Sequence, residues 1–531
     1  MKLISVAAMR DLEQRANAAG FTFMAMMQTA GERIALYVDQ KHRRGVQPYA
    51  LGLIGGGNNG GDTLIALSLL QSRGWNTRAI LARDRKPHDV LLQEYCRSGG
   101  AVVDAAKMNE LQHLEGIVLD GIYGTGFRSP LPEPIQNLLS DVSESLPGFA
   151  WIAVDCPSGM DCESGEVSRG TVKAAETVCL EAVKRGMLTY SAFPYLGELI
   201  TVDLGIARSL GRAGEPGDMV ITDELVHALL PKREAFSHKG SYGKALVIGG
   251  SANYPGAPVL AGRGAYAVGT GLVQVAVPAS VYPAGVTSCP ELTWVLLEDA
   301  GGCISEIAAE TVILYWMGCD SAVLGPGLGR HDSTRRFVFN LLLRENLAQG
   351  EVAGFHGVAR RQKTKYRDSG RPPLVIDADG LTLLGEDSAW FEKSNLTAVL
   401  TPHPGEMAHL TGLSVEEVQS DRMEVARRFA LQWGQTVVLK GPLTVVAGAD
   451  GHITVLPVAT SSLAKAGTGD VLAGMIAGFL AQGLSTWEAA LVGAWMHAQA
   501  GLATRKIVGC DESVLAGDVI RAIPEVYKLI E

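Results

Sequence analysis

Short apolar runs alternate along this chain with longer segments in which apolar positions recur at helical spacing. Each short run is closed by a turn rich in Gly, Asp or Pro, which predicts strands buried on both faces. Strands alternating with helices are typical of parallel α/β sheets, so the pattern predicts an α/β fold. We expect strands at residues 50–54, 77–81, 116–119, 151–154, 177–180, 199–202, 245–248, 273–277, 319–324, 374–376, 398–400 and 436–439.

The longer segments predict the helices. Residues 1–45 carry apolar positions at helical spacing and predict two helices joined near Gly20. Residues 63–70 and 260–268 each follow a Gly-rich turn and predict helices packed on the sheets. The apolar run 471–484 is shorter than a membrane span, so we expect a buried helix there.

The strand and helix pattern starts twice. Residues 205–217 have little apolar periodicity, and a new series of strands begins after residue 240. A chain of 531 residues is long for one domain. We therefore expect two domains, residues 1–215 and 216–531. A basic stretch at 351–372 interrupts the second and is interpreted as a solvated insertion, with a loop over an anionic ligand as the alternative.

Charge and cysteine content narrow the function classes. The net charge is −10 and the predicted core segments hold no long basic run, which argues against a nucleic-acid surface. The eight cysteines form no CxxC pair, which indicates reduced thiols rather than disulfides or a zinc site. Charged residues follow closely on the first apolar ones, which does not fit a secretion signal. We expect a cytoplasmic protein without membrane or nucleic-acid partners.

A glycine-rich turn follows the first predicted strand of the first half. Gly55, Gly57 and Gly60 satisfy G-x-G-x-x-G between a strand and a helix, and Asp84 lies near the end of the next strand. This spacing keeps a dinucleotide pocket open as an interpretation. The paired Asn58 and Asn59 are unusual for a dehydrogenase, and their amide oxygens could ligate a hard cation.

Two further carboxylates stand where strands of the first half end. Asp120 and Asp155 each follow a predicted strand directly. Because the carboxyl ends of parallel strands meet at one edge of a sheet, we expect both side chains to share a crevice with the asparagine turn. The alternative is that each aspartate only forms a turn.

The second half contains a turn that opens into the buried helix at 471–484. Gly467 and Gly469 allow backbone N–H groups to converge on an anion, and a helix start adds further free donors. A phosphate could bind there. Asp470 would then stand beside it, where a carboxylate can take the proton from a hydroxyl attacking phosphorus. The alternative is that Asp470 only caps the helix.

Several motifs resemble those of bifunctional NAD(P)H-hydrate repair enzymes. Gly-Gly-Asn-Asn-Gly-Gly-Asp (56–62), Gly-Thr-Gly-Phe (124–127) and Asp-Cys-Pro-Ser-Gly-Met-Asp (155–161) resemble the epimerase domain. Lys-Gly-Ser-Tyr-Gly-Lys (239–244), Thr-Pro-His-Pro-Gly-Glu-Met (401–407) and Gly-Thr-Gly-Asp-Val-Leu-Ala-Gly (467–474) resemble the ADP/ATP-dependent dehydratase domain. The resemblance implies an amino-terminal Rossmann-like three-layer α/β/α domain followed by a ribokinase-like α/β/α domain.

The resemblance also implies roles for residues of the first domain. Asp155 would be the acid/base, and Asn59, Asp120 and Ser158 would bind a potassium ion. Thr63 stands where the family usually has glycine and could narrow the pocket. The implied contacts to the hydrated substrate come from Asn58, Asn59, Gly60, Gly61, Asp62, Gly124, Thr125, Gly126, Phe127, Arg128, Ser129, Pro130 and Asp155.

For the second domain the resemblance implies Asp470 as the base, with Mg²⁺ accompanying ADP or ATP. The implied substrates are NADHX and NADPHX, and we expect a homo-oligomer, a tetramer or larger. The substrate contacts would be Ala257, Gly327, His403 and Asp470, and the nucleotide contacts Lys440, Gly441, Pro442, Leu443, Thr444 and Gly469.

The sequence leaves three other interpretations to consider. A ribokinase-like small-molecule kinase with a non-catalytic nucleotide-binding first domain shares the Gly-Thr-Gly-Asp turn, but residues 401–407 and the fused first domain count against it. A first domain that has lost catalysis and only senses nucleotides is supported by Thr63 alone. A Rossmann dehydrogenase would need a hydride-transfer site that the sequence does not present.

Overall fold

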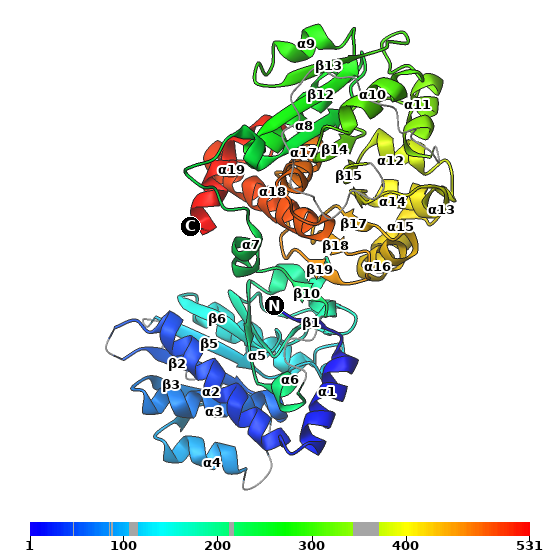
Figure 1. The fold of residues 1–531 in the computed structure, drawn as a ribbon. Coiled ribbons are helices and arrows are strands. Elements are labelled where there is room, and N and C mark those ends of the chain that lie inside the picture. Colours follow the sequence, from blue (N-terminus) through cyan, green and yellow to red (C-terminus); the bar gives the residue numbers. More distant parts are fainter. Residues whose placement is uncertain are drawn as a thin grey trace. The chain divides into compact units, whose positions relative to one another are not determined.

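The computed structural model describes residues 1–45, 47–83, 85, 89–105, 115–211, 217–343 and 371–530. It divides into two compact units, residues 1–220 and 221–531, each described by itself below (Figure 1). The expected boundary at 215/216, Asp84 and most of the basic stretch lie outside the described residues.

The first unit is built on one parallel sheet with the strand order β4-β3-β2-β5-β6-β7-β9. All strands predicted in this half are present, and β4 is an addition. The strand order reverses between β2 and β5, and open α/β sheets bind ligands at such a switch point. The strands are β2 (Tyr49–Ile54), β3 (Asn76–Leu81), β4 (Ala101–Val102), β5 (Gly116–Gly121), β6 (Phe149–Val154), β7 (Glu176–Leu180) and β9 (Glu198–Val202).

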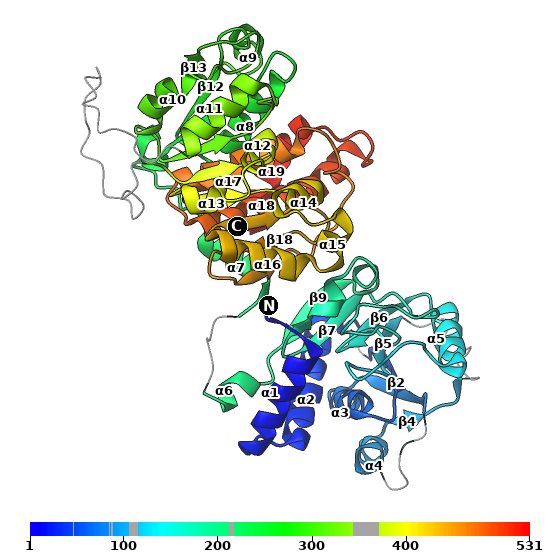
Figure 2. The same ribbon diagram turned by 90° about the vertical axis from the view of Figure 1, so that its right-hand side faces the viewer.

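Helices cover both faces of this sheet, as its continuously apolar strands require. Ala50 and Ile54 of β2 pack into a core with α1 (Val6–Ala18), α2 (Phe23–His42) and α3 (Asn58–Ser72). Leu51 and Leu53 belong to a second core with residues of α5 (Glu133–Ser145), which lies on the opposite side of the sheet from α3 (Figure 2). The α/β/α layering predicted for this half is therefore confirmed. Other elements are β1 (Leu3–Ile4), which pairs with β8 (Val183–Lys184), and α4 (Val90–Arg97), α6 (Ile206–Ser209) and β10 (Met219–Val220).

The sheet of the second unit follows the order β19-β18-β17-β16-β15-β14-β11-β12-β13. Pairing is parallel from β13 to β17, while β18 and β19 are antiparallel, which the sequence pattern did not predict. The switch point lies between β11 and β14. The strands are β11 (Lys244–Ile248), β12 (Leu272–Pro278), β13 (Thr293–Leu297), β14 (Ser321–Leu324), β15 (Leu374–Ile376), β16 (Ala398–Leu400), β17 (Thr436–Leu439), β18 (Val445–Ala447) and β19 (Ile453–Val455).

Helices again lie on both sides of this sheet (Figure 1). Alternate strand residues such as Val247 and Val323 share a core with α8 (Gly256–Ala267), α17 (Thr468–Ala481), α18 (Thr486–Val508) and α19 (Ala516–Ile530). The remaining helices are α7 (Asp223–Leu229), α9 (Tyr282–Val286), α10 (Ala308–Trp316), α11 (Asp332–Leu342), α12 (Asp379–Leu384), α13 (Trp390–Lys393), α14 (Pro404–Thr411), α15 (Val415–Ser420) and α16 (Arg422–Trp433).

Helices α8 and α17 touch through glycines. A Cβ on Gly474 would lie 1.9 Å from the carbonyl oxygen of Ala261, and one on Gly264 would lie 2.5 Å from that of Val471. Both distances are far shorter than a van der Waals contact, so the two backbones are as close as they can come. The buried helix predicted at 471–484 corresponds to α17, which begins three residues earlier and ends at Ala481. Within the described ranges no helix is long and apolar enough to cross a membrane. All eight cysteines are free thiols, as predicted.

Candidate active sites

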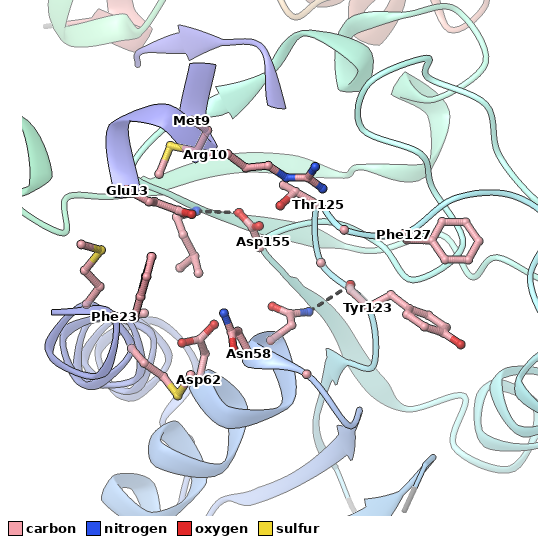
Figure 3. A pocket seen from close by; sticks show the side chains of 18 of the residues that line it. Met9, Arg10, Glu13, Phe23, Asn58, Asp62, Tyr123, Thr125, Phe127 and Asp155 are labelled. Atoms are coloured by element: carbon pink, nitrogen blue, oxygen red, sulfur yellow. Dashed lines mark hydrogen bonds between the residues drawn. The ribbon is translucent and has the colours of Figure 1, made fainter. Parts of the chain in front are cut away.

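A cavity of about 620 Å³ opens at the switch point of the first sheet (Figure 3). Its wall is formed by the residues that follow β2, β5, β6 and β7 and by the first two helices. The asparagine turn and Asp155 share this crevice as expected, whereas Asp120, expected in the same crevice, is buried and not part of its wall. The lining includes Arg10, Glu13, Phe23, Asn58, Asn59, Asp62, Arg83, Tyr123, Gly124, Thr125, Gly126, Phe127, Asp155, Leu180 and Lys184.

Asp155 is held from two sides at the end of β6. Its φ of 65° lies in the left-handed region, where aspartate is one of the few residues tolerated. The backbone N–H of Leu180 donates to Oδ1 at 3.1 Å, and Lys184 Nζ makes an ion pair with the same oxygen. Burial lowers the pKa of Lys184, but the charge and hydrogen bond of Asp155, together with the nearby Cys179 and Cys162, outweigh burial and the pKa is raised overall.

Two further carboxyls face the same cavity. Asp62 lies in the first turns of α3 and Glu13 on α1 (Figure 3). Burial, followed by the charge of Asp155, raises the pKa of both, and that of Asp62 lies well above its usual range. Neighbouring carboxyls whose surroundings give them different pKa values can divide the roles of proton donor and proton acceptor.

Asn59 lines the cavity, whereas Asp120 and Ser158 are buried, and the backbone of Tyr123 hydrogen-bonds to both Asn59 and Ser158. Asn59 Nδ2 donates to the carbonyl oxygens of Tyr123 and Val154, both at 3.0 Å, while its Oδ1 is buried and has no hydrogen-bond partner in the described part of the chain. Ser158 donates to Asp120 through its hydroxyl at 2.6 Å and its backbone N–H at 2.9 Å. Burial nevertheless raises the pKa of Asp120. Unpartnered amide oxygens, carboxylates and hydroxyls are the ligand types that hard cations prefer.

The other residues expected in this site are distributed unevenly. Gly124 to Phe127 line the cavity, but Gly60, Gly61 and the run 128–130 are not part of its wall. Gly60 and Gly61 instead permit close packing of α3, because a Cβ on Gly60 would lie 2.1 Å from the carbonyl oxygen of Gly55. Thr63 is also not part of the cavity wall. Its hydroxyl donates to the carbonyl oxygen of Asn59 at 2.8 Å within α3.

Arg128, Ser129 and Pro130 form a loop beside the cavity. Arg128 pairs with Asp161 at 3.2 Å, and Ser129 donates to Glu166 at 2.8 Å. Sequence reasoning missed Lys184 and Glu13. Lys184 stands four residues beyond the end of β7, so a basic residue following a predicted strand end was the signal available. Glu13 gave none that distinguishes it from a solvated helix residue.

The second candidate site lies at the carboxyl edge of the second sheet. Gly327 follows β14 with φ 64°, and a Cβ placed on it would lie 3.0 Å from the Cβ of Ala257 on α8. These two expected substrate residues are therefore neighbours at the switch point. Gly467 has φ 88° and begins α17, so the first N–H groups of that helix are presented at the same edge.

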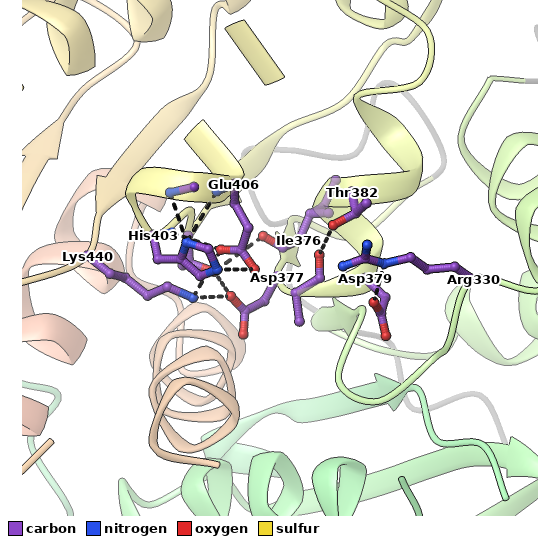
Figure 4. Close-up of polar contacts among 11 residues, drawn as sticks. Arg330, Ile376, Asp377, Asp379, Thr382, His403, Glu406 and Lys440 are labelled. Atoms are coloured by element: carbon purple, nitrogen blue, oxygen red, sulfur yellow. Dashed lines mark hydrogen bonds and ion pairs between the residues drawn. The ribbon is translucent and has the colours of Figure 1, made fainter. Parts of the chain in front are cut away.

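Asp470 lies in the first turn of α17 close to a network of charged residues. Lys440 follows β17 and binds Asp377, which follows β15, at 2.6 Å, and Thr401 donates to the same oxygen at 2.7 Å (Figure 4). Burial and then the charge of Asp377 raise the pKa of Asp470 to about 7, although Lys440 opposes them. A carboxylate that titrates near neutrality is suited to general-base catalysis.

His403 caps helix α14. Its Nδ1 accepts hydrogen bonds from the backbone N–H groups of Gly405 at 3.0 Å and Glu406 at 3.2 Å, and Glu406 accepts from the His403 N–H at 2.8 Å (Figure 4). This reciprocal capping fixes the ring at the helix start. Its side chain is 57% exposed, so the imidazole remains accessible to a ligand.

The expected nucleotide loop, residues 440–444, connects β17 to β18. Gly441 and Leu443 have φ values of 139° and 53°, and the Thr444 hydroxyl donates to the Gly441 carbonyl at 2.7 Å. Leu443 is buried while Pro442 is exposed. Gly469 lies beside Lys440, since a Cβ there would be 3.5 Å from its Nζ. The geometry therefore joins Lys440 to the carboxylate network as well as to the loop.

Comparison with known proteins covers both units. A family model described as YjeF-related protein N-terminus matches residues 24–186, and one described as NAD(P)H-hydrate dehydratase matches 245–349 and 357–525. A solved ADP/ATP-dependent NAD(P)H-hydrate dehydratase from Bacillus subtilis, co-crystallized with ATP/Mg²⁺, is 30% identical over 59% of this chain and 99% of that chain, with a TM-score of 0.47.

Curated relatives match from end to end. The bifunctional NAD(P)H-hydrate repair enzyme of Moorella thermoacetica is 31% identical over 100% of this chain and 97% of its own length. The enzyme of the same name from Gloeobacter violaceus is 32% identical over 97% of this chain and 96% of its own length. The chain, with its epimerase-type and dehydratase-type units, belongs to the family of bifunctional NAD(P)H-hydrate repair enzymes.

Proposed function

We propose that this protein restores hydrated NADH and NADPH, with one step at each site. The first unit interconverts the R and S forms of the hydrate. The second unit dehydrates the S form, using ADP or ATP as phosphoryl donor. The observation that carries this proposal is that each unit places an aspartate at the carboxyl edge of its own sheet, in a chain that matches the bifunctional relatives over its full length.

In the first site Asp155 acts as the acid/base on the hydrate. The ring nitrogen donates its electron pair as the hydroxyl leaves, and Asp62, whose pKa is raised by burial, gives the proton that converts this hydroxyl to water. Water then adds to the same carbon from the other face and gives a proton to Asp155, whose Oδ2 accepts no hydrogen bond among the described residues. Transfer of that proton back to Asp62 closes the cycle. The glycine-rich turns at 56–62 and 124–127 would hold the rest of the nucleotide through backbone N–H groups.

The side chains of Asn59, Asp120 and Ser158 fit a potassium ion. Asn59, Asp120 and Ser158 would hold it, because they provide neutral and anionic oxygens and Asn59 Oδ1 is buried without a partner in the described structure. The ion would supply positive charge that stabilises the closely packed strand ends. Asp120 would then stay ionised despite its burial.

In the second site Asp470 takes the proton of the substrate hydroxyl as the terminal phosphoryl group is transferred to that oxygen. Phosphate then leaves with the bonding electrons while the ring nitrogen donates its own pair, and loss of a proton from the adjacent carbon restores the dihydronicotinamide. Ala257, Gly327 and His403 would contact the hydrate. A positioned general base contributes about 10²–10⁴-fold to such a step.

The nucleotide would lie between the 440–444 loop and the start of α17, where Gly469 leaves room for phosphate. Mg²⁺ would accompany it, held by the phosphates and one or two carboxylates of this edge, and would neutralise charge on the transferred group. We also propose a cytoplasmic homo-oligomer, a tetramer or larger, which light scattering during gel filtration tests directly.

The deciding experiment adds purified protein, Mg²⁺ and ADP or ATP to a mixture of NADHX epimers and follows the return of dihydronicotinamide absorbance. Conversion of the whole mixture faster than spontaneous epimerisation supports both activities. A fast phase that stops when the S form is consumed refutes the first activity. No recovery with either nucleotide refutes the repair function and favours the small-molecule kinase.

A further inference from the structure

Lys184 is a buried lysine to which the chemistry above assigns no part. It ends the short strand β8, which pairs with β1 through Ile4. Its side chain is 1% exposed, although it lies at the wall of the first cavity. Burying an ammonium group costs free energy unless an anion and further hydrogen bonds compensate it. A buried lysine at such a place therefore requires an explanation.

The contacts of Lys184 are specific. Its Nζ pairs with Asp155 Oδ1 and donates to the carbonyl oxygen of Leu180 at 3.1 Å, and the Leu180 N–H donates to the same Oδ1, also at 3.1 Å. Oδ1 thus has two donors, whereas among the described residues Oδ2 accepts no hydrogen bond. The carboxylate is consequently fixed by one oxygen, and the Asp155 side chain faces the cavity (Figure 3).

The other titratable groups around this pair do not compete for the ammonium. Burial raises the pKa of the Cys179 thiol to about 12, and a hydrogen bond with Cys162, together with burial, raises the pKa of Cys156. Glu13 and Asp62 have raised pKa values as described above. Asp155 is therefore the anion that balances the lysine. The charged and titratable groups facing the pair are Arg10 and Glu13 of α1, Asp62 of α3, Cys156 and Cys162 after β6, and Cys179 of β7.

We propose that Lys184 is a positioning residue of the first site, which holds Asp155 ionised by its Oδ1 and leaves Oδ2 directed at the hydrated ring. This inference rests on the proposed epimerase activity. A merely structural role, in which the pair only connects β8 to the end of β6, predicts that loss of Lys184 lowers the activity equally at every pH.

The test compares the pH profile of kcat/KM for epimerisation in wild type, Lys184→Met and Lys184→Arg. Without its cation a buried carboxylate holds a proton more tightly, so in Lys184→Met the acidic limb should move upward by about 1–3 pH units, with activity regained at high pH. Lys184→Arg keeps the charge and should keep the limb near its wild-type position, with a lower plateau because the side chain is larger.

Lys2→Met is the matched control. Lys2 pairs with the buried Glu181 at 2.7 Å in the same unit but outside the cavity wall, and its loss should leave the limb in place. Dehydration of pure S-NADHX by the second unit, measured in the same samples, reports the amount of intact enzyme. A uniform fall at every pH in Lys184→Met would overturn the proposal, whereas absence of epimerisation in wild type would refute the underlying function instead.

A second measurement does not depend on activity. Lysine-selective NMR should show a protonated Lys184 in wild type at neutral pH and a markedly lower titration point in Asp155→Asn, where the ammonium loses its anion. If the Lys184 signal titrates identically in both proteins, the pairing has no effect on charge and the inference fails. This measurement also decides the question if Lys184→Met does not fold.

Discussion

The two sites combine the same residue types but connect them differently. In the first, the buried lysine binds the aspartate that faces the cavity, Asp155. In the second, Lys440 binds Asp377 at 2.6 Å, and in the described structure no hydrogen bond joins it to Asp470. Burial and then the charge of Asp377 raise the pKa of Asp470 to about 7, against the smaller opposing charge of Lys440.

The difference matches the chemistry each site has to perform. Epimerisation runs in both directions, so its acid/base must give and take protons beside groups such as Asp62 that hold them. Phosphoryl transfer needs a base that removes one proton as the hydroxyl attacks. A lysine bonded to the reacting carboxylate suits the former, and a lysine bonded to its neighbour leaves the latter more basic.

Asp155→Ala should separate the two sites most strongly. We expect epimerisation to fall about 10²–10⁴-fold because the acid/base is lost, while dehydration of the S form is unchanged. The rate at which the variant converts pure R-NADHX to NADH measures the loss of epimerisation. Adding the Asp470→Ala variant, which should keep epimerisation, should restore this rate. Loss of both activities would mean that the substitution unfolds the protein.

Asp470→Ala is the reciprocal change. Dehydration should fall about 10²–10⁴-fold because the hydroxyl keeps its proton during attack, and the R and S forms should still interconvert. Chromatographic separation of the epimers follows the surviving activity without requiring NADH formation. Retained dehydration would show that another group is the base.

Asp377→Asn should shift the acidic side of the pH profile of dehydration rather than abolish dehydration. Wild-type dehydration should lose activity below about pH 7 because Asp470 becomes protonated. Removing the negative neighbour makes protonation of Asp470 less favourable, so the limb should move to lower pH by about one unit. The profile of kcat/KM at saturating nucleotide measures the shift. An unmoved limb would show that Asp377 does not act on Asp470.

Replacing potassium by tetramethylammonium should produce the smallest of these effects. We expect a several-fold loss of epimerisation and a lower thermal midpoint of the first unit, because a ligand that binds the folded state stabilises it. Dehydration should not change. Asn59→Ala removes the unpartnered amide oxygen and should abolish the dependence on potassium, whereas Thr63→Gly should preserve it. Equal activity in both salts would refute the site.

Much of the architecture was predictable because strands buried on both faces are continuously apolar. Runs such as 374–376 and 398–400 coincide with β15 and β16 to the residue. The antiparallel strand β18 was missed because its direction depends on the turn at Gly441 and Leu443, where φ is positive, and β19 pairs with it in turn. Direction of this kind is set by backbone geometry that composition does not encode.

The sites were predictable in part for the same reason. Strand-end residues such as Asp155 converge because parallel strands end at one edge. The partners of those residues were not predictable, because Lys184 reaches Asp155 through the path of the chain after β7, and Lys440 after β17 reaches Asp377 after β15 across the one intervening strand, β16. Which carboxylate a lysine binds depends on side-chain placement in three dimensions.

The glycine contact between α8 and α17 fixes the separation of two helices that carry site residues. Helix α8 carries Ala257 and α17 carries Asp470, and at Gly264 and Gly474 there is no space for a side chain between the helices. A larger residue at either position would push the helices apart and increase the distance between Ala257 and Asp470. Directed evolution toward a bulkier substrate should therefore vary these two positions, because they change the spacing of the site and leave its reacting groups intact.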